Sequence, residues 1–299
     1  MGSIKNILIT GATGYLGSNL VETFINEGYS VAIIKRTSSD TKRIRHLEDK
    51  IKIYDIDNLD YKNVFEDNNI DCVIHTAASY GRKGETLSSV YNANLVFPVQ
   101  LLENCIKYGV KYFFNTNTSL PANLNTYSLS KKQFSDVLEL SRGSMKVVDI
   151  KLEYFYGPGD DTSKFVTFII SKILNEDKSI ELSPGTQVRD FIYIKDVTAA
   201  YLTLINQIDD LLDYTQISLG SGVGISLRNL TERIKALAGD NNTTLNFEAL
   251  PLRPGEIMYS VSDNNFLNKL GWQPRYNLDE SLIETIKIEK SSYYDYNKQ

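Results

Sequence analysis

A glycine-rich turn between two apolar segments near the N-terminus restricts the fold of this chain more than any other feature. Ile4–Thr10 is apolar enough for a buried strand, and Tyr15–Glu27 has the pattern of a helix. Between them, Gly11–Gly17 carries a glycine at every third position, and Ser30–Lys35 predicts a second strand. Strand, glycine turn, helix and strand form a βαβ unit, which requires a parallel sheet.

The same alternation continues through the first half of the chain. Four further segments read as strands, with helix-like segments between them: Ile51–Tyr54, Cys72–His75, Lys111–Phe114 and Val147–Lys151. Strands that alternate with helices in this way predict an α/β fold, a doubly wound parallel sheet of the Rossmann type with right-handed crossovers.

The alternation ends after Gly157–Gly159, where helices mix with short strands and with glycine and proline turns. We therefore expect two domains. The larger one comprises residues 1–156 and a returning segment at about 187–222. The smaller one, of mixed α/β structure, comprises about 157–186 and 223–299 and would hold the substrate.

The composition excludes several classes of protein. The net charge of −5 provides no general basic surface, so we expect no binding to nucleic acid. Cys72 and Cys105 are isolated and lack the spacing of a metal site or a disulfide framework, so no metal is expected. The sequence shows neither a signal-peptide run nor an apolar stretch long enough to cross a membrane, which predicts a cytoplasmic protein without a membrane partner.

The glycine turn has the position of a phosphate-binding loop. A dinucleotide pyrophosphate would meet the amides at the start of the helix there, and the spacing G-x-x-G-x-x-G differs from the G-x-G-x-x-G of common dehydrogenases. A purely structural turn is the alternative. The predicted cofactor contacts in this loop are Gly11, Thr13, Gly14, Tyr15, Leu16 and Gly17.

The end of the second predicted strand indicates which dinucleotide is bound. An acidic residue at this place usually binds the ribose hydroxyls of NAD, whereas an arginine suits the 2′-phosphate of NADP. The chain has Lys35 and Arg36 here. This predicts NADP(H) as the cofactor, and the alternative is that both cations are simply solvated.

Tyr127 and Lys131 are four residues apart, so a helix would place them on one face, one turn apart. A free phenol has a pKa of about 10, and lowering it to about 7 takes about 4 kcal/mol. One ammonium about 4 Å away, at an effective dielectric of about 20, supplies about that much. The pair is therefore a candidate proton donor and its tuning cation, against the alternative of a solvated helix face.

A set of motifs along the chain resembles the extended short-chain dehydrogenases/reductases, the NAD-dependent epimerase/dehydratase family, which acts mainly on nucleotide-linked sugars. The motifs are Gly11–Gly17, Asp55-Ile56, His75–Ala78, Tyr127–Lys131, Tyr156–Gly159 and Arg189–Tyr193. Within this family, Ser79–Lys83, Phe114–Thr118 and Leu152–Asp160 are most similar to reductases of CDP-linked 4-keto-3,6-dideoxyhexoses. These enzymes serve bacterial surface-polysaccharide synthesis.

The resemblance implies roles for further residues. Asp55 and Ile56 would contact the adenine, Ala77 would lie along the cofactor, Asn94 would be a structural or relay asparagine, and Lys131 would also hold the nicotinamide ribose. Arg189 and Arg253 would bind the nucleotide diphosphate, as suits the bidentate guanidinium. The other predicted substrate contacts are Ser79, Tyr80, Arg82, Thr116, Asn117 and Glu153. We interpret His75, between Ile74 and two alanines, as a packed structural residue.

By the same resemblance, Thr116 completes a catalytic triad with Tyr127 and Lys131. Tyr127 would protonate the oxygen of a C4 ketone while NADPH reduces it, and Thr116 would orient that oxygen. Sugar dehydratases carry an aspartate and a glutamate after this threonine, whereas this chain has Asn117 and Thr118. Dehydration is therefore not expected.

Three functions remain open in the sequence. The first is the CDP-sugar ketoreductase, the second a nucleotide-sugar 4-epimerase, and the third a non-catalytic NADP-binding regulator, which the retained tyrosine and lysine disfavour. The segment between Thr116 and Tyr127 is shorter than usual in the family, so the pose of the sugar is not predicted. The resemblance also implies a homodimer formed by helices near Val90–Lys107 and Ser128–Leu140.

Overall fold

The computed structural model describes residues 4–82, 84–240 and 242–296, which belong to two compact units. The first unit extends to Leu152 and also includes Tyr201–Ile217. Its seven-stranded parallel sheet has the order β10-β6-β5-β4-β1-β2-β3. The strands are β1 (Asn6–Thr10), β2 (Ser30–Lys35), β3 (Ile51–Asp55), β4 (Cys72–His75), β5 (Tyr112–Thr118), β6 (Lys146–Leu152) and β10 (Tyr214–Leu219). The predicted doubly wound Rossmann sheet is confirmed, because six of the strands follow the order 3-2-1-4-5-6.

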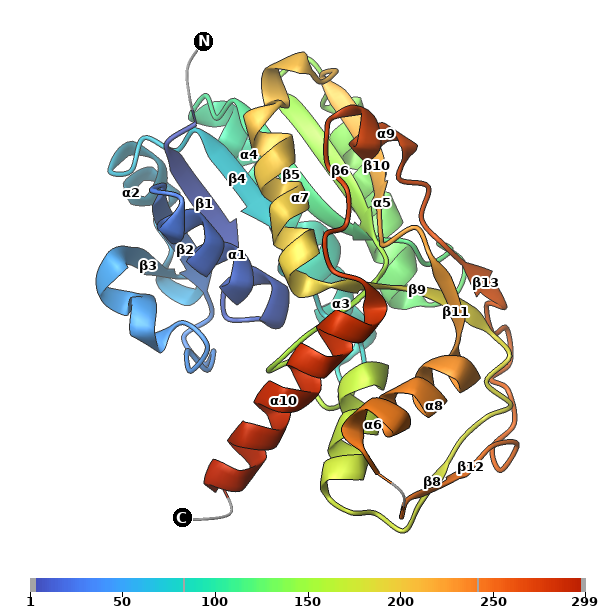
Figure 1. Ribbon diagram of the computed structural model, residues 1–299. Coiled ribbons are helices and arrows are strands. Elements are labelled where there is room, and N and C mark those ends of the chain that lie inside the picture. The colour runs from blue at the N-terminus through green and yellow to red at the C-terminus, as the bar shows by residue number, and fades with distance from the viewer. Residues whose placement is uncertain (1–3, 83, 241, 297–299) are drawn as a thin grey trace. The chain divides into compact units, whose positions relative to one another are not determined.

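Helices cover both faces of this sheet, as the alternating side chains of its strands require (Figure 1). Phe113 of β5 packs on one face with Leu101 and Phe134. The next residue, Phe114, points to the other face, where its ring centroid lies 6.3 Å from that of Tyr201. The helices are α1 (Tyr15–Asn26), α2 (Tyr61–Glu66), α3 (Leu87–Tyr91), α4 (Phe97–Lys107), α5 (Thr126–Leu140) and the part of α7 (Ile194–Asn206) from Tyr201 onward, with a π-helical turn, Asn92–Val96, between α3 and α4.

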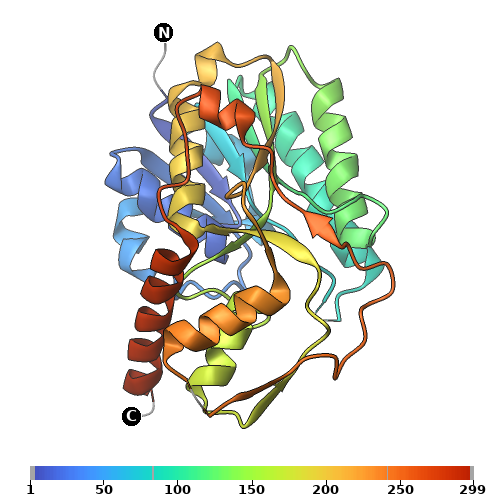
Figure 2. The same ribbon diagram turned by 45° about the vertical axis from the view of Figure 1, so that its right-hand side comes forward.

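The second unit comprises Glu153–Ala200 and the chain from Ser218 onward. In its small sheet, β9 (Val188–Tyr193) pairs with β7 (Tyr154–Tyr156), β11 (Gly224–Ser226) and β13 (Tyr259–Ser260), and β8 (Ser179–Glu181) pairs separately with β12 (Thr244–Asn246). Three helices pack together beside it: α6 (Phe165–Leu174), α8 (Leu227–Ala238) and α10 (Leu278–Tyr296) (Figure 2). The short α9 (Asn265–Lys269) follows β13.

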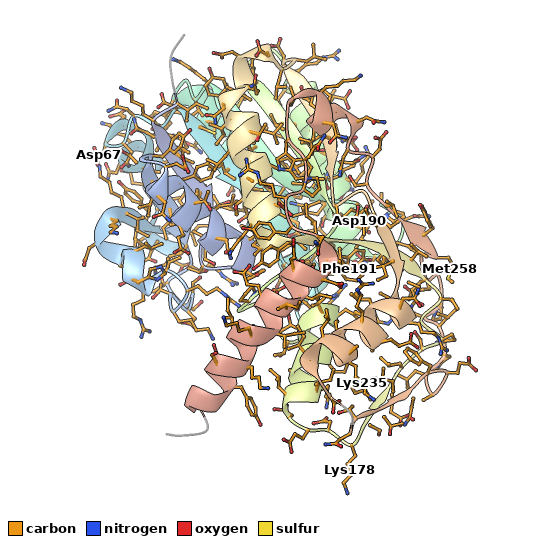
Figure 3. All side chains as sticks on the ribbon, viewed as in Figure 1. Asp67, Lys178, Asp190, Phe191, Lys235 and Met258 are labelled. Atoms are coloured by element: carbon orange, nitrogen blue, oxygen red, sulfur yellow. The ribbon has the colours of Figure 1, made fainter. Side chains whose placement is uncertain are left out.

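Asp190, labelled in Figure 3, holds the centre of the second unit together. Its buried carboxylate accepts hydrogen bonds from the backbone amides of Ser221, Gly222 and Ser262 at 2.7–3.1 Å. These bonds join β9 to two distant segments. The segment 187–222, which we expected to return to the larger domain, is divided between the two units. Residues 201–217 lie in the first unit, and the remainder lies in the second.

Candidate active site

The glycine turn is shaped by close backbone contacts. Gly11 has a φ of +72°, and a Cβ on it would lie 2.5 Å from the backbone nitrogen of Ala77, two residues after the end of β4. A Cβ on Gly17 would lie 2.2 Å from the Gly11 carbonyl oxygen. These two glycines therefore let the turn, α1 and the end of β4 approach one another.

The start of α1 is suited to an anion. Its N-cap, Gly14, provides no side-chain cap, and no acidic residue lies in the first turn. The backbone amides at this end thus keep their capacity for a phosphate. Gly14 is exposed, Thr13 and Tyr15 are half-buried, and Leu16 is buried. The structure places all the predicted loop residues around this helix start.

The two cations at the end of β2 have different environments. The ammonium of Lys35 pairs with Asp55 at 2.6 Å, and its side chain is only 14% exposed. Arg36 is exposed, and its guanidinium has no hydrogen-bond partner among the described residues. Its charge and the amide of Thr37 lower the pKa of Asp57, with the Thr37 bond the larger cause. Of the two predicted cations, Arg36 is the one available to a ligand.

Helix α5 carries both Tyr127 and Lys131 because a capping box fixes where it starts. The side chain of Asn125 accepts from the Ser128 amide at 2.9 Å, and the Ser128 hydroxyl accepts from the Asn125 amide at 3.2 Å. Tyr127 is then the second residue of the helix, and Lys131 lies one turn further. The predicted juxtaposition on one helical face is present in the structure.

Lys131 is buried, with 1% of its surface exposed, and its Nζ has no hydrogen-bond partner among the residues that the structure describes. Burial lowers the pKa of this ammonium to about 8, against an opposing effect of the Asp149 carboxylate. An ammonium that is buried and lacks acceptors costs free energy unless a ligand supplies them. Lys131 is therefore a candidate for binding a polar ligand.

The environment of Tyr127 does not match the expectation of a lowered pKa. Loss of water raises the pKa of this phenol, and Tyr80 raises it further, whereas Thr118 and Arg82 lower it. The ring centroids of Tyr80 and Tyr127 are 4.8 Å apart. The lowered pKa was expected from the charge of Lys131 alone, but Lys131 is itself buried. In this arrangement the resting phenol is protonated, as a proton donor must be.

Thr118, and not Thr116, is the threonine beside Tyr127. The Thr116 hydroxyl lies 2.6 Å from the phenol oxygen of Tyr201. Thr118 lowers the pKa of the Tyr127 phenol, and its own hydroxyl oxygen accepts from the Leu120 amide at 3.2 Å. Both threonines lie on one face of β5 because side chains repeat every two residues, but Thr118 is the last residue of the strand. Its position nearest the following loop brings it to α5.

A buried polar network behind these residues was not predicted. The carboxylate of Asp149, on β6, accepts from Asn115 at 2.7 Å, from Asn117 at 2.9 Å, from Ser135 at 2.6 Å and from Gln216 at 2.9 Å. Asn117, predicted as a substrate contact, is buried here, and its other amide atom accepts from the Thr118 backbone. A lone aspartate in an apolar strand segment was the only sequence signal for this network.

Asn94 joins the loop after β4 to α5. It accepts from the Ser79 amide at 2.8 Å and donates to the Ser79 carbonyl at 2.8 Å and to the Ser130 hydroxyl at 3.0 Å. Asn94 is fully buried in the π-helical turn, a feature frequent at functional sites. Asn94 therefore holds the loop after β4 against α5, which fits the structural role predicted for it.

His75 is enclosed by aromatic rings, including Phe97 and Phe134, and its Nδ1 lies 2.7 Å from the Thr10 hydroxyl. Burial and the charge of Lys131 hold its pKa well below the usual value, so the imidazole is neutral. These contacts fit the structural role expected for it. Ile56 is half-buried and packs against the core, and Ala77 is half-buried beside the glycine turn.

The predicted substrate residues of the second unit differ in exposure. Glu153 is buried and accepts from the Ser260 hydroxyl at 2.9 Å. Arg189 is buried, pairs with Glu256 at 2.6 Å and lies over the ring of Tyr154 at 5.7 Å. Arg253 is exposed, in a turn in which the Glu256 amide donates to its carbonyl.

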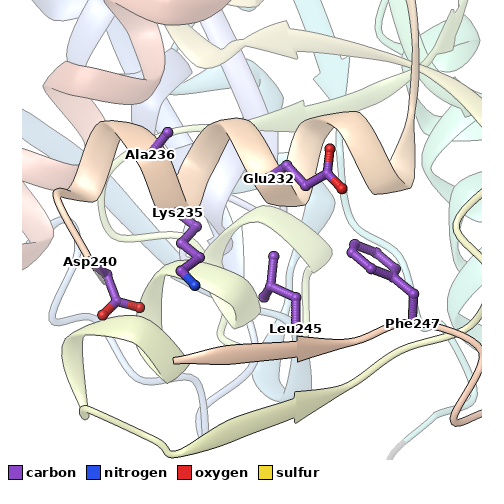
Figure 4. Close-up of a pocket in the computed structure, with 6 residues that line it drawn as sticks. All are labelled: Glu232, Lys235, Ala236, Asp240, Leu245 and Phe247. Atoms are coloured by element: carbon purple, nitrogen blue, oxygen red, sulfur yellow. The ribbon is translucent and has the colours of Figure 1, made fainter. Parts of the chain in front are cut away.

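A separate pocket of about 440 Å³ lies in the second unit between α8 and β12 (Figure 4). Its lining is Glu232, Lys235, Ala236, Asp240, Leu245 and Phe247. None of these is a predicted site residue, and both signs of charge are present. The pocket does not contribute to the proposed chemistry.

The described residues contain neither a metal site nor a membrane-spanning helix. No group of three or more histidine, cysteine or acidic side chains could hold a metal ion. No helix in the described part of the chain is long and apolar enough to cross a membrane. Cys72 and Cys105 are free and buried.

Comparison with known proteins identifies the class. Residues 7–220 match the NAD dependent epimerase/dehydratase family, and the chain belongs to this family, which confirms the resemblance drawn from the sequence. It is 28% identical over 296 residues to CDP-abequose synthase of Salmonella typhimurium, covering 94% of this chain and 97% of that protein.

Epimerases of the family are also similar to this chain. UDP-glucose 4-epimerase of Yersinia enterocolitica is 26% identical over 340 residues, covering 98% of this chain and 99% of that protein. The structure of UDP-glucuronic acid 4-epimerase from Bacillus cereus, in complex with UDP-glucuronic acid and NAD, has a TM-score of 0.85 at 24% identity. That alignment covers 96% of this chain and all of the other, and it shows that the fold is shared.

Proposed function

We propose that this protein is an NADPH-dependent reductase of the C4 ketone of a CDP-linked 4-keto-3,6-dideoxyhexose, of the CDP-abequose or CDP-paratose synthase type. It would act in the cytoplasm, in the synthesis of surface-polysaccharide sugars. The observation that carries the proposal is that Tyr127 and the buried, unpartnered Lys131 lie one turn apart on α5, with Thr118, the last residue of β5, lowering the pKa of the Tyr127 phenol. The full-length similarity to CDP-abequose synthase supports the choice of substrate.

The residues present fit a nicotinamide dinucleotide. The uncapped start of α1 suits its pyrophosphate, and the unpartnered ammonium of Lys131 suits its ribose hydroxyls. Asp55 and Ile56 lie at the end of β3, where adenine contacts are proposed. When bound, the cofactor supplies the hydride.

Protein groups supply the proton and the electrostatic stabilisation. The phenol of Tyr127 gives its proton to the substrate oxygen as negative charge develops there, and the Thr118 hydroxyl orients the phenol and that oxygen. Lys131 then stabilises the phenolate. With Thr118 as the threonine of the triad, the next residues are Ser119 and Leu120, so the acid and base of a dehydratase are absent in this register as well.

Arg36 favours NADPH over NADH. Because Lys35 is paired with Asp55, the cation proposed to bind the 2′-phosphate is Arg36. Arg36→Ala should raise the KM for NADPH about 10-fold to 100-fold, in line with the loss of one charge-assisted contact, and leave that for NADH unchanged. Lys42→Ala, which removes an equal charge from an exposed side chain, is the control. Equal effects on both cofactors would contradict the assignment.

On the substrate side, we propose that Arg189 and Arg253 bind the nucleotide diphosphate. Arg189 is buried and held by Glu256, so a diphosphate would compete with that carboxylate for the guanidinium. Glu153, Ser79, Tyr80 and Arg82 are proposed contacts of the sugar or nucleotide.

The test is a panel of CDP-, dTDP-, GDP- and UDP-linked 4-keto sugars with NADPH and NADH, in which cofactor oxidation is recorded and the product's C4 configuration is read by NMR. We expect oxidation of NADPH with a CDP-linked sugar. A 4-epimerase, the second candidate because of the similar epimerases, would interconvert two sugars without net cofactor use. No turnover of any keto sugar would overturn the reductase.

A further inference from the structure

Gln187 carries a buried hydrogen-bond acceptor that no described group of the protein uses. The residue directly precedes β9 and is 4% exposed. Its side-chain nitrogen donates to the Ser183 hydroxyl at 3.4 Å, whereas its side-chain oxygen is buried and has no hydrogen-bond partner among the described residues. A buried amide oxygen without a donor costs free energy unless a ligand supplies one. Gln187 is therefore a candidate for contact with a hydrogen-bond donor of a ligand.

The backbone around Gln187 is fixed by hydrogen bonds on both sides. The Leu227 amide donates to the Gln187 carbonyl at 3.1 Å, which continues the antiparallel pairing of β11 with β9. Before Gln187, the Arg228 side chain donates to the Pro184 carbonyl at 3.1 Å, and its amide donates to the Gly185 carbonyl at 2.9 Å. The segment is thus held against the start of α8, and the side chain of Gln187 projects from a preorganised backbone.

Gln187 lies on the same face of the extended chain as Arg189. Side chains two residues apart in a strand point to one side, about 6.6 Å apart along the chain. Gln187 and Arg189 are both buried, whereas Val188 between them is half-buried. Arg189, which pairs with Glu256, is the residue proposed to bind the nucleotide diphosphate. A nucleotide bound there would bring the group next to its diphosphate to Gln187.

The nucleoside is the part of the substrate that fits Gln187. The phenol proposed to protonate the sugar oxygen, Tyr127, belongs to the first unit. The hydrogen-bond partners of Gln187, Ser183 and Leu227, belong to the second unit, as does Arg189. We therefore assign the nucleoside, and not the sugar, to Gln187.

The group that Gln187 presents distinguishes one base from another. Because its nitrogen is used by Ser183, the group left for a ligand is the oxygen, which accepts. Cytosine carries an exocyclic amine, a donor, where thymine and uracil carry a carbonyl oxygen. Two oxygens that face each other in a buried site are both left without a donor. A site that accepts from an N–H group therefore rejects an analogue that lacks it.

We propose that Gln187 determines the base specificity of the nucleotide site by accepting a hydrogen bond from the exocyclic amine of cytosine, an inference that rests on the proposed function. Arg189 binds the diphosphate, and Gln187 contacts the base. Gln187 takes no part in hydride or proton transfer, so its effect is on nucleotide binding.

The test measures the binding of CDP and UDP to the purified protein by titration calorimetry, so it needs no turnover. The wild type should bind CDP about 10-fold or more tightly than UDP, as one hydrogen bond allows. Gln187→Met, which keeps the length of the side chain and removes the carboxamide, should weaken CDP binding about 10-fold and leave UDP binding unchanged. Gln187→Glu keeps an acceptor and should keep the preference for CDP. Gln100→Met, the same change at an exposed glutamine of α4, should change neither affinity.

The outcomes separate the base contact from the proposed function. Equal weakening of CDP and UDP in Gln187→Met would make Gln187 a ribose contact and overturn the base contact, as would unchanged CDP binding. If Gln187→Met does not fold, Gln187→Glu decides, because loss of its preference for CDP overturns the proposal. A wild type that binds CDP selectively but reduces no keto sugar with NADPH would overturn the proposed function and leave the base contact in place.

Discussion

Two threonines of β5 lie on the same face of the sheet but have different partners. Thr118 lowers the pKa of the Tyr127 phenol, and the Thr116 hydroxyl lies 2.6 Å from the phenol oxygen of Tyr201. We expect Thr118→Val to lower kcat/KM about 100-fold or more, as when one preorganised donor is lost from an active site. Thr116→Val should leave kcat/KM within a few-fold, and should lower the free energy of unfolding by about 1 kcal/mol, the typical contribution of one hydrogen bond.

Steady-state kinetics and denaturant unfolding of the two purified variants check this prediction. Each variant serves as the other's control, since both replace a threonine of the same strand by a residue of the same shape. A folded Thr116→Val that loses more activity than Thr118→Val would return the catalytic role to Thr116.

Lys131 is a buried cation, so its replacement separates function from stability. Its pKa of about 8 instead of 10.5 corresponds to a cost of about 3 kcal/mol at about 1.36 kcal/mol per unit. Lys131→Met should therefore abolish reduction and yet raise the free energy of unfolding of the cofactor-free protein at pH 7. Denaturant unfolding of the wild type and of Lys131→Met measures this difference in free energy.

The difference in the free energy of unfolding between Lys131→Met and the wild type should depend on pH. Below pH 8 lysine is charged in both the folded and unfolded states, and the whole cost is present. Between pH 8 and 10.5 the unfolded chain binds more protons than the folded protein, so the wild type gains stability as the pH rises. The advantage of Lys131→Met should thus shrink over this range. A difference that is independent of pH would contradict it.

Spacing in the sequence predicted that Tyr127 and Lys131, the proposed reacting pair, share a helical face, but it did not predict the surroundings of these two residues. Four residues between Tyr127 and Lys131 set their common helical face. Burial is the largest cause of the raised pKa of Tyr127, and Tyr80, which is 47 positions earlier in the chain and close only in the fold, raises it further. Likewise, the sequence did not show that Lys35 of β2 pairs with Asp55 of β3. This ion pair leaves Arg36 as the cation that is available to a ligand.

At the scale of elements, Asp149 joins β5, β6, α5 and β10 by buried hydrogen bonds. Asp149→Asn should lower the free energy of unfolding by about 1–3 kcal/mol, because buried donors lose a charged acceptor. It should also lower the pKa of Lys131 further, because the carboxylate raises that pKa in the wild type. The alkaline limb of the pH profile of kcat/KM should move to lower pH.

Asn115→Ala is the matched control for Asp149→Asn. It removes one hydrogen bond from the same network but leaves the negative charge in place. Its stability should fall, while the alkaline limb should stay where it is in the wild type. If both variants shifted the limb equally, the effect would come from packing and not from the charge of Asp149.

Strand boundaries were predicted where the side chains were apolar and missed where they were polar and buried. β5 was expected to end at Phe114, but it continues to Thr118. Asn115 and Asn117 have the composition of a turn, and their burial in a strand depends on Asp149 of the neighbouring strand. That partner cannot be recognised from local sequence. The missed four residues include the threonine beside Tyr127.

Neither compact unit is a continuous stretch of chain. The glycine turn and the strand–helix alternation were sufficient to predict the parallel sheet, because each βαβ step is local. The membership of β9 was not predictable, because its partners β7, β11 and β13 come from separate parts of the sequence. Composition alone therefore could not position the boundaries near residues 187–222.

Exposed apolar side chains lie on α4 and α5 and the turn before them, among them Val96 at 44%, Leu129 at 39% and Leu140 at 86% exposure. Leu129 and Leu140 are eleven residues apart and so share a helical face. We expect two copies of the chain to bury these faces, so light scattering should give twice the 33.8 kDa chain mass.

The double variant Leu129→Glu, Leu140→Glu should be monomeric, because carboxylates would be buried without partners. Leu250→Glu, which changes a leucine of the second unit that is 49% exposed, should remain dimeric. A monomeric wild type would refute the dimer.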